Sequence, residues 1–367
     1  MLAVPVFQVG APVRGVQSAR SKTPTAEGLK LIWEQVFQKS PISLTDNFHA
    51  LGGNAREADA ICDEIERIYG QHLSGVTISH VPTVAELAAF LQQDPLPRLS
   101  PFIQIKTGSA PPPIFFAHGL SGMVEYYTLA QHIRTDHPIY GVQARGLDGI
   151  DEPFDRVEDM AGFYLDGFAR IHPNGPYYLI GYSFGGLVAF EMAQRLVAQG
   201  KKVGMLALVD AYPHPRFMPP NPRLRLFGRR MKTHARNMNA LSMSSALSYF
   251  GRGLRRKFRI AVPAENGSNP AVPEGSLAAT MPRVNQKAYR AFSNYRPRHY
   301  PGLVQFVTTK IQTFFPGDPA AVWRRLSADL VVETIPGDHL NILSTEYRPL
   351  ADALSRFVAR SDADLRI

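Results

Sequence analysis

Cysteine is almost absent from the sequence, since Cys62 is the single one among 367 residues. One cysteine cannot form a disulfide within the chain, which excludes the disulfide-stabilised class of secreted domains and predicts a reducing, cytoplasmic compartment. Cys62 falls on the apolar side of a predicted helix and has no pattern of His or Asp partners around it. We therefore interpret it as a buried core thiol and not as a nucleophile.

Long apolar runs are also lacking. No stretch approaches the roughly 20 residues that a membrane-spanning helix needs, so we expect no membrane span. Residues 1–22 have no charged start followed by an apolar core, which is typical of an arm or linker and not of a signal peptide. The 45% of apolar residues in the chain is enough for one large core and a small second domain.

Acidic residues are missing from one long basic stretch. Between His214 and Ala264 the sequence has twelve Arg and Lys residues and no Asp or Glu. Residues 24–94 carry a net charge of −6, in a chain whose total is +9. This opposition predicts an acidic module that docks near a basic one. The chain has no recognised nucleic-acid motif, so we expect no nucleic-acid partner.

The most informative stretch runs from residue 177 to residue 193. A short apolar run of β-forming residues leads into Gly181-Tyr182-Ser183-Phe184-Gly185, and strong helix formers follow. At a strand-to-helix turn, G-x-S-x-G forms a nucleophile elbow that lifts the serine hydroxyl above the sheet edge. Side chains at 181 and 185 would collide with the apposed strand and helix, and Ser183 has to adopt a strained backbone conformation. We predict that Ser183 is a nucleophile, the alternative being a structural glycine-rich turn.

Apolar strands alternate with helical patterns from residue 113 onward. Continuous apolar strands separated by helices predict a parallel sheet that is covered on both faces, which is the α/β-hydrolase arrangement. A long segment, about 214–290, interrupts this rhythm between two strands and predicts a lid over the site. The expected strands are 114–117, 139–142, 177–180, 204–209, 303–307 and 331–335, with helices that include 160–170 and 187–199.

A serine nucleophile needs a base and an acid that orients the base. His339 follows the last predicted strand, and loops at the carboxyl ends of parallel strands gather at one edge of the sheet, so we predict it as the base. Asp210 and Asp318 are both candidates for the acid, because each preserves the chain order Ser, Asp, His. Asp210 comes directly after its strand and Asp318 about ten residues after its own, so reach favours Asp210. Asp338 adjoins the histidine, and we interpret it as a loop carboxylate.

Acyl transfer also needs donors for the developing oxyanion. In an α/β-hydrolase these are backbone N–H groups, one from the residue after the serine and one from the loop after the first large strand. We predict Phe184 and Leu120, with the alternative that His118-Gly119 is only a turn. We expect no metal site. The remaining histidines near helices, His132, His137 and His172, are interpreted as solvated or capping side chains.

Residues 23–94 predict a small helical domain. Helical periodicity appears at 24–36 and at 55–69, where Ala58, Ile61, Cys62, Ile65 and Ile68 form the inner face. Thr83 and Glu86 form a capping signature for a last short helix. The segment resembles a four-helix peptidyl or acyl carrier domain through the motifs Ile32-Trp33, Asp46-Asn47-Phe48, Leu51-Gly52-Gly53-Asn54 and Pro82-Thr83-Val84-Ala85-Glu86-Leu87.

The resemblance implies a phosphopantetheine arm at the residue that follows Leu51-Gly52-Gly53-Asn54. In carrier domains this residue is a serine, but here it is Ala55. Alanine has no hydroxyl to join to phosphate, so phosphopantetheine is expected as a cofactor only if residue 55 were serine. Either the serine has been replaced, which holds the carrier uncharged, or the domain is a naturally degenerate docking adaptor.

Residues 113–362 are expected as the second domain, and 113–358 resemble the type I thioesterase domain that ends nonribosomal peptide and polyketide assembly lines. The resemblance implies an acyl or peptidyl chain that passes from a carrier to Ser183 and leaves by hydrolysis or cyclisation, with Asp210 as the acid. It also implies upstream synthase modules as partners and no cofactor on this domain. Residues 95–112 are expected as a linker. The matching motifs are Phe116-Ala117-His118-Gly119, Gln143-Ala144-Arg145-Gly146-Leu147, Gly175-Pro176-Tyr177, the elbow, Leu208-Val209-Asp210, Tyr300-Pro301-Gly302, Trp323 and Gly337-Asp338-His339.

Two other functions remain open from the sequence. The chain can be a stand-alone serine esterase or acyl-CoA hydrolase with a relic carrier. It can also be a docking adaptor for another synthase, because Ala55 cannot be charged. The identity of the acyl chain and the choice between hydrolysis and cyclisation depend on the shape of the lid. The sequence alone does not give this shape.

Overall fold

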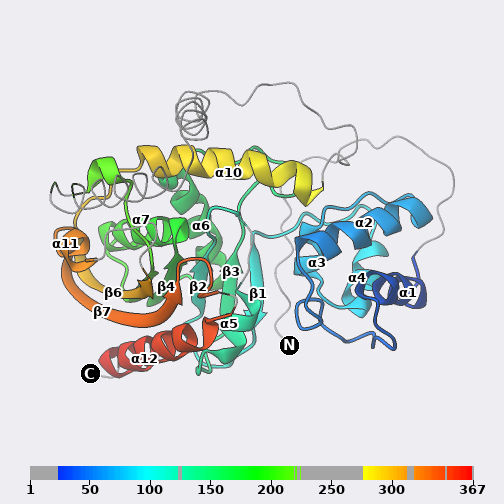
Figure 1. Cartoon of the computed structure of the whole chain (residues 1–367), viewed down its shortest axis with the longest axis horizontal. Helices are drawn as coiled ribbons and strands as arrows, with labels where there is room; N and C mark the ends of the chain where they lie inside the picture. Colours follow the sequence, from blue (N-terminus) through cyan, green and yellow to red (C-terminus); the bar gives the residue numbers. More distant parts are fainter. Residues whose placement is uncertain are drawn as a thin grey trace, which may run out of the picture.

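The computed structural model describes residues 24–122, 126–218, 276–311, 318–343 and 345–365, together with residues 220 and 224. Within them, a seven-stranded sheet of order β1-β3-β2-β4-β5-β6-β7 lies beside a unit of four helices (Figure 1). The expected N-terminal arm, 1–22, lies outside the described residues. So does most of the expected lid, including the basic residues between 225 and 264.

The sheet is parallel except at one edge. The strands β2 to β7 pair in parallel, whereas β1 pairs with β3 in antiparallel orientation. The expected α/β-hydrolase sheet is therefore confirmed, and its strands are longer than the sequence suggests at β6 and β7. The strands are β1 (Phe102–Lys106), β2 (Ile114–Ala117), β3 (Ile139–Val142), β4 (Tyr177–Tyr182), β5 (Val203–Val209), β6 (Tyr300–Ile311) and β7 (Ser327–Asp338).

Strand β1 corrects one expectation. The sequence predicts a linker over 95–112, but Phe102–Lys106 joins the sheet, with Phe102 opposite Val142 and Ile103 opposite Gly141. The side chains of Phe102, Ile103 and Ile105 are buried while that of Gln104 is exposed. An edge strand can be this short, and its five residues follow a proline-rich stretch that hides the alternation.

Helices cover both faces of the sheet. On one face α6 (Val157–Ile171), α7 (Phe184–Ala198), α10 (Leu277–Asn294) and α11 (Ala320–Trp323) enclose a core with Phe190 and Trp323. On the other face α5 (Tyr127–His132) and α12 (Tyr347–Leu365) enclose a second core with Ile180 and Leu354. A 3₁₀ turn, η1 (Pro215–Phe217), follows β5. None of the described helices is both long and apolar enough to cross a membrane.

The N-terminal helices form a third core. They are α1 (Ala26–Phe37), α2 (Ala55–Tyr69), α3 (Val76–His80) and α4 (Val84–Leu91), packed around Trp33 and Phe48. Asn54 and Glu57 form a capping box at the start of α2, and Thr83 caps α4 as predicted. The assignment of Ile68 to the inner face is wrong, because its side chain is 47% exposed. It lies in the last turn of α2.

The helical unit packs against the sheet domain near the amino end of β1. Leu147, Leu277 and Val284, which belong to the sheet domain, are buried in the core of the helical unit. The His49 ring stacks on Tyr127 of α5, with centroids 5.2 Å apart and 25° between the planes. These contacts hold the helical unit near the carboxyl ends of β2 and β3.

Candidate active site

Ser183 stands at the turn between β4 and α7. Its backbone has φ of 53° and ψ of −121°, a left-handed conformation that a residue other than glycine adopts at a cost of about 1–3 kcal/mol. The N–H of Ser183 donates to the Val209 carbonyl at 2.9 Å, and the Ser183 carbonyl accepts from the Gly186 N–H at 3.1 Å. The backbone strain predicted for this serine is therefore present, and its side chain is half-buried at the carboxyl edge of the sheet.

The elbow has no room for a side chain at either of its two glycines. A Cβ atom at Gly185 would lie 2.3 Å from the His118 carbonyl oxygen and 2.5 Å from that of Ala117. A Cβ atom at Gly181 would lie 2.3 Å from the Gly185 carbonyl oxygen. Since all of these neighbours are backbone atoms, they cannot move aside cheaply, and the predicted collisions are confirmed.

His339 and Asp210 meet at the same edge of the sheet. His339 directly follows β7, and its Nδ1 lies 2.8 Å from Oδ2 of Asp210, which is 1% exposed and follows β5. Because a carboxylate only accepts hydrogen bonds, Nδ1 is the donor in this pair, and Nε2 lies on the opposite side of the ring. Tyr182 holds the imidazole from its other side, with ring centroids 5.0 Å apart and a hydrogen bond from its hydroxyl to the His339 carbonyl.

The other two candidate carboxylates serve local structure. Asp318 Oδ1 accepts from the Ala321 N–H at 3.2 Å, at the start of α11. Asp338 Oδ1 accepts from the Leu340 N–H at 2.8 Å within the loop that carries His339. Among the described hydrogen bonds, the imidazole of His339 is paired with Asp210 and with neither of these two.

The predicted oxyanion donors come from two loops at this edge. Phe184 is the first residue of α7, so its N–H lies at the amino end of the helix, where the helix dipole favours negative charge. Leu120 lies within a turn that the Gly122 N–H closes on the Gly119 carbonyl at 3.2 Å. The structure thus brings both loops to the edge that carries Ser183.

A buried pair that the sequence did not reveal supports this turn. His118 is 1% exposed, and its Nδ1 donates to the Gly119 carbonyl at 2.7 Å. Burial lowers the pKa of His118 to about 4, so its ring is neutral and Nε2 accepts from the Tyr164 hydroxyl at 2.8 Å. His118 and Tyr164 lie 46 residues apart in the sequence, and no local pattern links them.

Removing the Tyr164 hydroxyl tests this support. We expect Tyr164→Phe to lower the free energy of unfolding by about 1–2 kcal/mol, because His118 Nε2 loses its partner in a buried place. We also expect kcat to fall about tenfold, because the turn that contains Leu120 loses this support and moves away from the oxyanion. Urea unfolding and turnover of a small acyl thioester measure the two effects.

The control is Tyr140→Phe, which removes a half-buried hydroxyl on β3 that forms no hydrogen bond within the described residues. A Tyr164→Phe protein with lower stability but parental kcat would show that the hydroxyl supports the fold alone.

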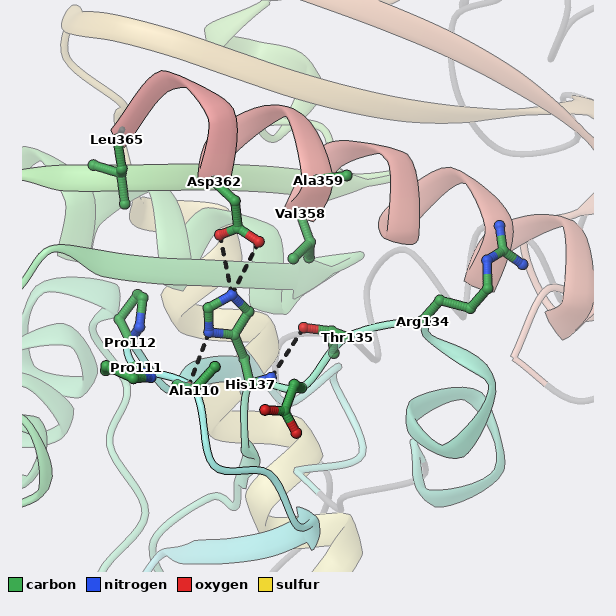
Figure 2. A pocket seen from close by; sticks show the side chains of 11 residues that line it. Ala110, Pro111, Pro112, Arg134, Thr135, His137, Val358, Ala359, Asp362 and Leu365 are labelled. Atoms are coloured by element: carbon green, nitrogen blue, oxygen red, sulfur yellow. Dashed lines mark hydrogen bonds and ion pairs between the residues drawn. The ribbon is translucent and has the colours of Figure 1, made fainter. Parts of the chain in front are cut away.

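A cavity of about 370 Å³ lies at the amino ends of β2 and β3, at the opposite end of these strands from the elbow (Figure 2). Its lining includes Pro112, two residues before β2, and His137, two residues before β3. His137 is 5% exposed and contacts Asp362 of α12 at 3.0 Å, so its interpretation as a solvated or capping residue is wrong. Asp362 also accepts from the Tyr178 hydroxyl at 2.7 Å, which fastens α12 to the sheet. This cavity is separate from the elbow.

Metal ligands do not gather at either place. Within the described ranges there is no group of three or more His, Cys, Asp or Glu side chains arranged to hold an ion. The Cys62 thiol is buried in the helical core, and burial raises its pKa, which makes the reactive thiolate rare.

Comparisons with known proteins find similarity to thioesterase domains and to nonribosomal peptide synthetases. Residues 112–226 match the thioesterase domain family. Malpibaldin synthetase of Mortierella alpina is 38% identical over 188 residues, which cover 50% of this chain and 3% of the synthetase. A dimodular nonribosomal peptide synthase of Bacillus subtilis (strain 168) is 34% identical over 220 residues, which cover 59% of this chain and 9% of that protein. The chain thus spans a small part of the length of these relatives.

One solved structure aligns with nearly the whole chain. It is a four-domain nonribosomal peptide synthetase, holo-AB3403, bound to AMP and glycine. The TM-score is 0.54 at 22% identity, and the alignment covers 94% of this chain and 27% of that one. At this identity the likeness concerns the fold, and its coverage extends into the N-terminal helices.

Proposed function

We propose that this chain, which contains a thioesterase domain of the nonribosomal peptide synthetase type, transfers an acyl or peptidyl group from a phosphopantetheine thioester to Ser183 and then releases it. The observation that carries the proposal is the 2.8 Å contact between His339 and Asp210 at the sheet edge of the strained serine. A base, an oriented acid and an elbow on three separate loops are the parts that acyl transfer needs.

The residues act in two steps. Ser183 Oγ attacks the thioester carbonyl while Nε2 of His339 takes the hydroxyl proton, and the Asp210 carboxylate stabilises the imidazolium. The N–H groups of Phe184 and Leu120 stabilise the oxyanion, and the thiol leaves with the proton from His339. In the second step, His339 activates water or a nucleophile of the acyl chain itself, which breaks the acyl–serine ester.

The helical unit supports delivery from a carrier, although its own attachment position does not fit the arm. Residue 55 is the first residue of α2 and is half-buried, but as alanine it offers no oxygen to phosphate. We therefore propose that this chain takes its acyl group from a thioester outside itself, or from its own carrier after restoration of a serine. The partners are then a carrier domain and the upstream modules that load it.

A second function follows from Ala55. A chain that cannot charge its own carrier can act as an esterase or acyl-CoA hydrolase, with the helical unit as a docking adaptor. The two proposals differ in substrate. A chain-releasing thioesterase turns over an acyl group on a carrier arm faster than the same group on CoA or on a simple ester.

Mass spectrometry of the protein and its products tests the proposed function. With a panel of synthetic acyl and peptidyl pantetheine thioesters, we expect a transient mass gain of one acyl group on the peptide that contains Ser183. Linear and cyclic products distinguish hydrolysis from cyclisation. An acyl group on another residue, or turnover of simple esters that exceeds that of every thioester, would reject the proposal.

A further inference from the structure

We propose that the first turn of α10 is a recognition element for the carrier-like unit. Its N–H groups bind an acidic residue that lies four positions after the attachment position. The inference rests on the proposed function and adds a selection of carriers to it. The residue in question is Asp59, one helical turn beyond residue 55 on the same face of α2. Figure 1 shows α10 extending from above the sheet toward α2.

The Asp59 carboxylate caps a helix of the other unit. Its Oδ1 accepts from the Leu277 N–H at 2.9 Å and its Oδ2 accepts from the Ala278 N–H at 3.1 Å. The next N–H, of Ala279, donates to the Ser276 hydroxyl at 3.3 Å. The first N–H groups of a helix have no partner within it and carry a partial positive charge. A carboxylate of α2 therefore accepts the free N–H groups at the start of α10, although the two residues lie 218 positions apart in the sequence.

An apolar contact accompanies the charge. Leu277 is 0% exposed and belongs to the core of the helical unit. A Cβ atom at Gly75 would lie 2.6 Å from Asp59 Oδ1 and 2.8 Å from Leu277 Cδ1. A side chain at Gly75 would therefore push Asp59 or Leu277 out of this contact. A matching carrier needs an aspartate four positions after its attachment residue.

A second point of contact is the backbone at Leu147, which accepts hydrogen bonds from both units. The Leu147 carbonyl, in the loop after β3, accepts from the Thr280 hydroxyl of α10 at 2.9 Å and from the Ser74 hydroxyl at 3.4 Å. Asp59 belongs to α2 and Ser74 to the loop before α3, so the unit is held at two points. This geometry fixes its orientation, whereas a single charge contact would leave it free to rotate.

Helix α10 continues from this contact to the candidate active site. A Cβ atom at Gly122 would lie 2.8 Å from Val284 Cγ1, so α10 touches the loop that carries Leu120. Further along, Ala288 and Ala291 are buried in the core with α6 and α7. A carrier docked on the first turn of α10 therefore rests on the helix that borders the predicted oxyanion loop, with residue 55 one turn from the contact.

Hydrogen exchange on the full-length chain tests the contact itself. We expect Asp59→Ala to speed exchange of the Leu277 and Ala278 amides about tenfold, because they lose their acceptor. The control is Asp63→Ala, which removes the same charge from an exposed position of α2 that forms no hydrogen bond in the described part of the chain. Unchanged exchange at these two amides in the Asp59→Ala protein would overturn the inference.

Acyl release tests the recognition. In an Ala55→Ser background charged with an acyl-pantetheine arm, we expect Asp59→Ala to slow release from the carrier about tenfold and to leave turnover of a small soluble thioester unchanged. Equal release with and without Asp59 would refute the role in recognition. If the Ala55→Ser protein accepts no arm, the same acyl group on a separate charged carrier with the matching aspartate replaces it. If the parent turns over no thioester at all, the proposed function fails, while hydrogen exchange still decides the contact.

Discussion

Replacing Ser183 with alanine is expected to lower kcat for acyl thioesters by about 10⁵–10⁶, the largest effect of any single substitution in this chain. The hydroxyl is the atom that forms the acyl–enzyme bond, and no other described side chain combines a strained turn with an imidazole–carboxylate pair at the same edge. Alanine also occupies the elbow without a new clash, because it lacks only the Oγ atom. Single-turnover measurements with a pantetheine thioester follow the loss.

The matched control for this substitution is Ser109→Ala. Ser109 is exposed before β2, at the opposite edge of the sheet, where its hydroxyl donates to Asp136 at 2.7 Å. We expect this protein to keep the parental kcat. Melting curves of both proteins should stay near that of the parent, so that lost activity reports chemistry and not unfolding. Release of acyl chains by the Ser183→Ala protein at the parental rate would exclude the serine mechanism.

Local sterics explain why the elbow could be predicted from the sequence. The two glycines at 181 and 185 and the change from strand to helix formers lie within one short stretch. A Cβ atom at either glycine would lie 2.3 Å from a backbone carbonyl oxygen, which accounts for both. Helix α2 was likewise predictable, since Asn54 and Glu57 cap it and its apolar residues recur at helical spacing. These features depend on residues that are close in the sequence.

Contacts between distant residues account for what the sequence did not show. The pairing of His118 with Tyr164 and that of Asp59 with α10 join residues that no periodicity connects. Strand β1 was missed because its place in the sheet depends on β3 and not on its own pattern. The burial of His137 follows in the same way from α12, which supplies Asp362 from the far end of the chain.

The predicted acid, Asp210, is intermediate between these two cases. The sequence placed Asp210 and Asp318 after consecutive strands and favoured Asp210 by reach alone. In the structure, Asp210 has φ of 44°, and its N–H donates to the Val307 carbonyl at 2.8 Å, which turns the carboxylate toward His339. Thr309 Oγ1 donates to Oδ2 of Asp210 at 3.4 Å. The strained backbone at a strand end, which a sequence cannot display, selects between the two carboxylates.

Replacing Asp210 with asparagine is expected to lower kcat by about 10⁴. The amide nitrogen of asparagine donates a hydrogen bond where the carboxylate accepts one, so it favours the imidazole tautomer whose proton is on Nε2. His339 then cannot take the proton of Ser183, and the positive charge that it acquires in the transition state loses its partner. Rapid-quench measurement of acyl–enzyme formation isolates this step from release.

Asp318→Asn provides the internal comparison, because it makes the same chemical change in a carboxylate that caps α11. We expect this protein to keep kcat within about twofold of the parent and to lose about 0.5–2 kcal/mol of stability at most, the range for a lost helix cap. The reverse order, with a deeper loss in Asp318→Asn than in Asp210→Asn, would mean that Asp318, and not Asp210, is the partner of His339 during catalysis. The pair of substitutions therefore tests whether the 2.8 Å contact between His339 and Asp210 is the one that operates during turnover.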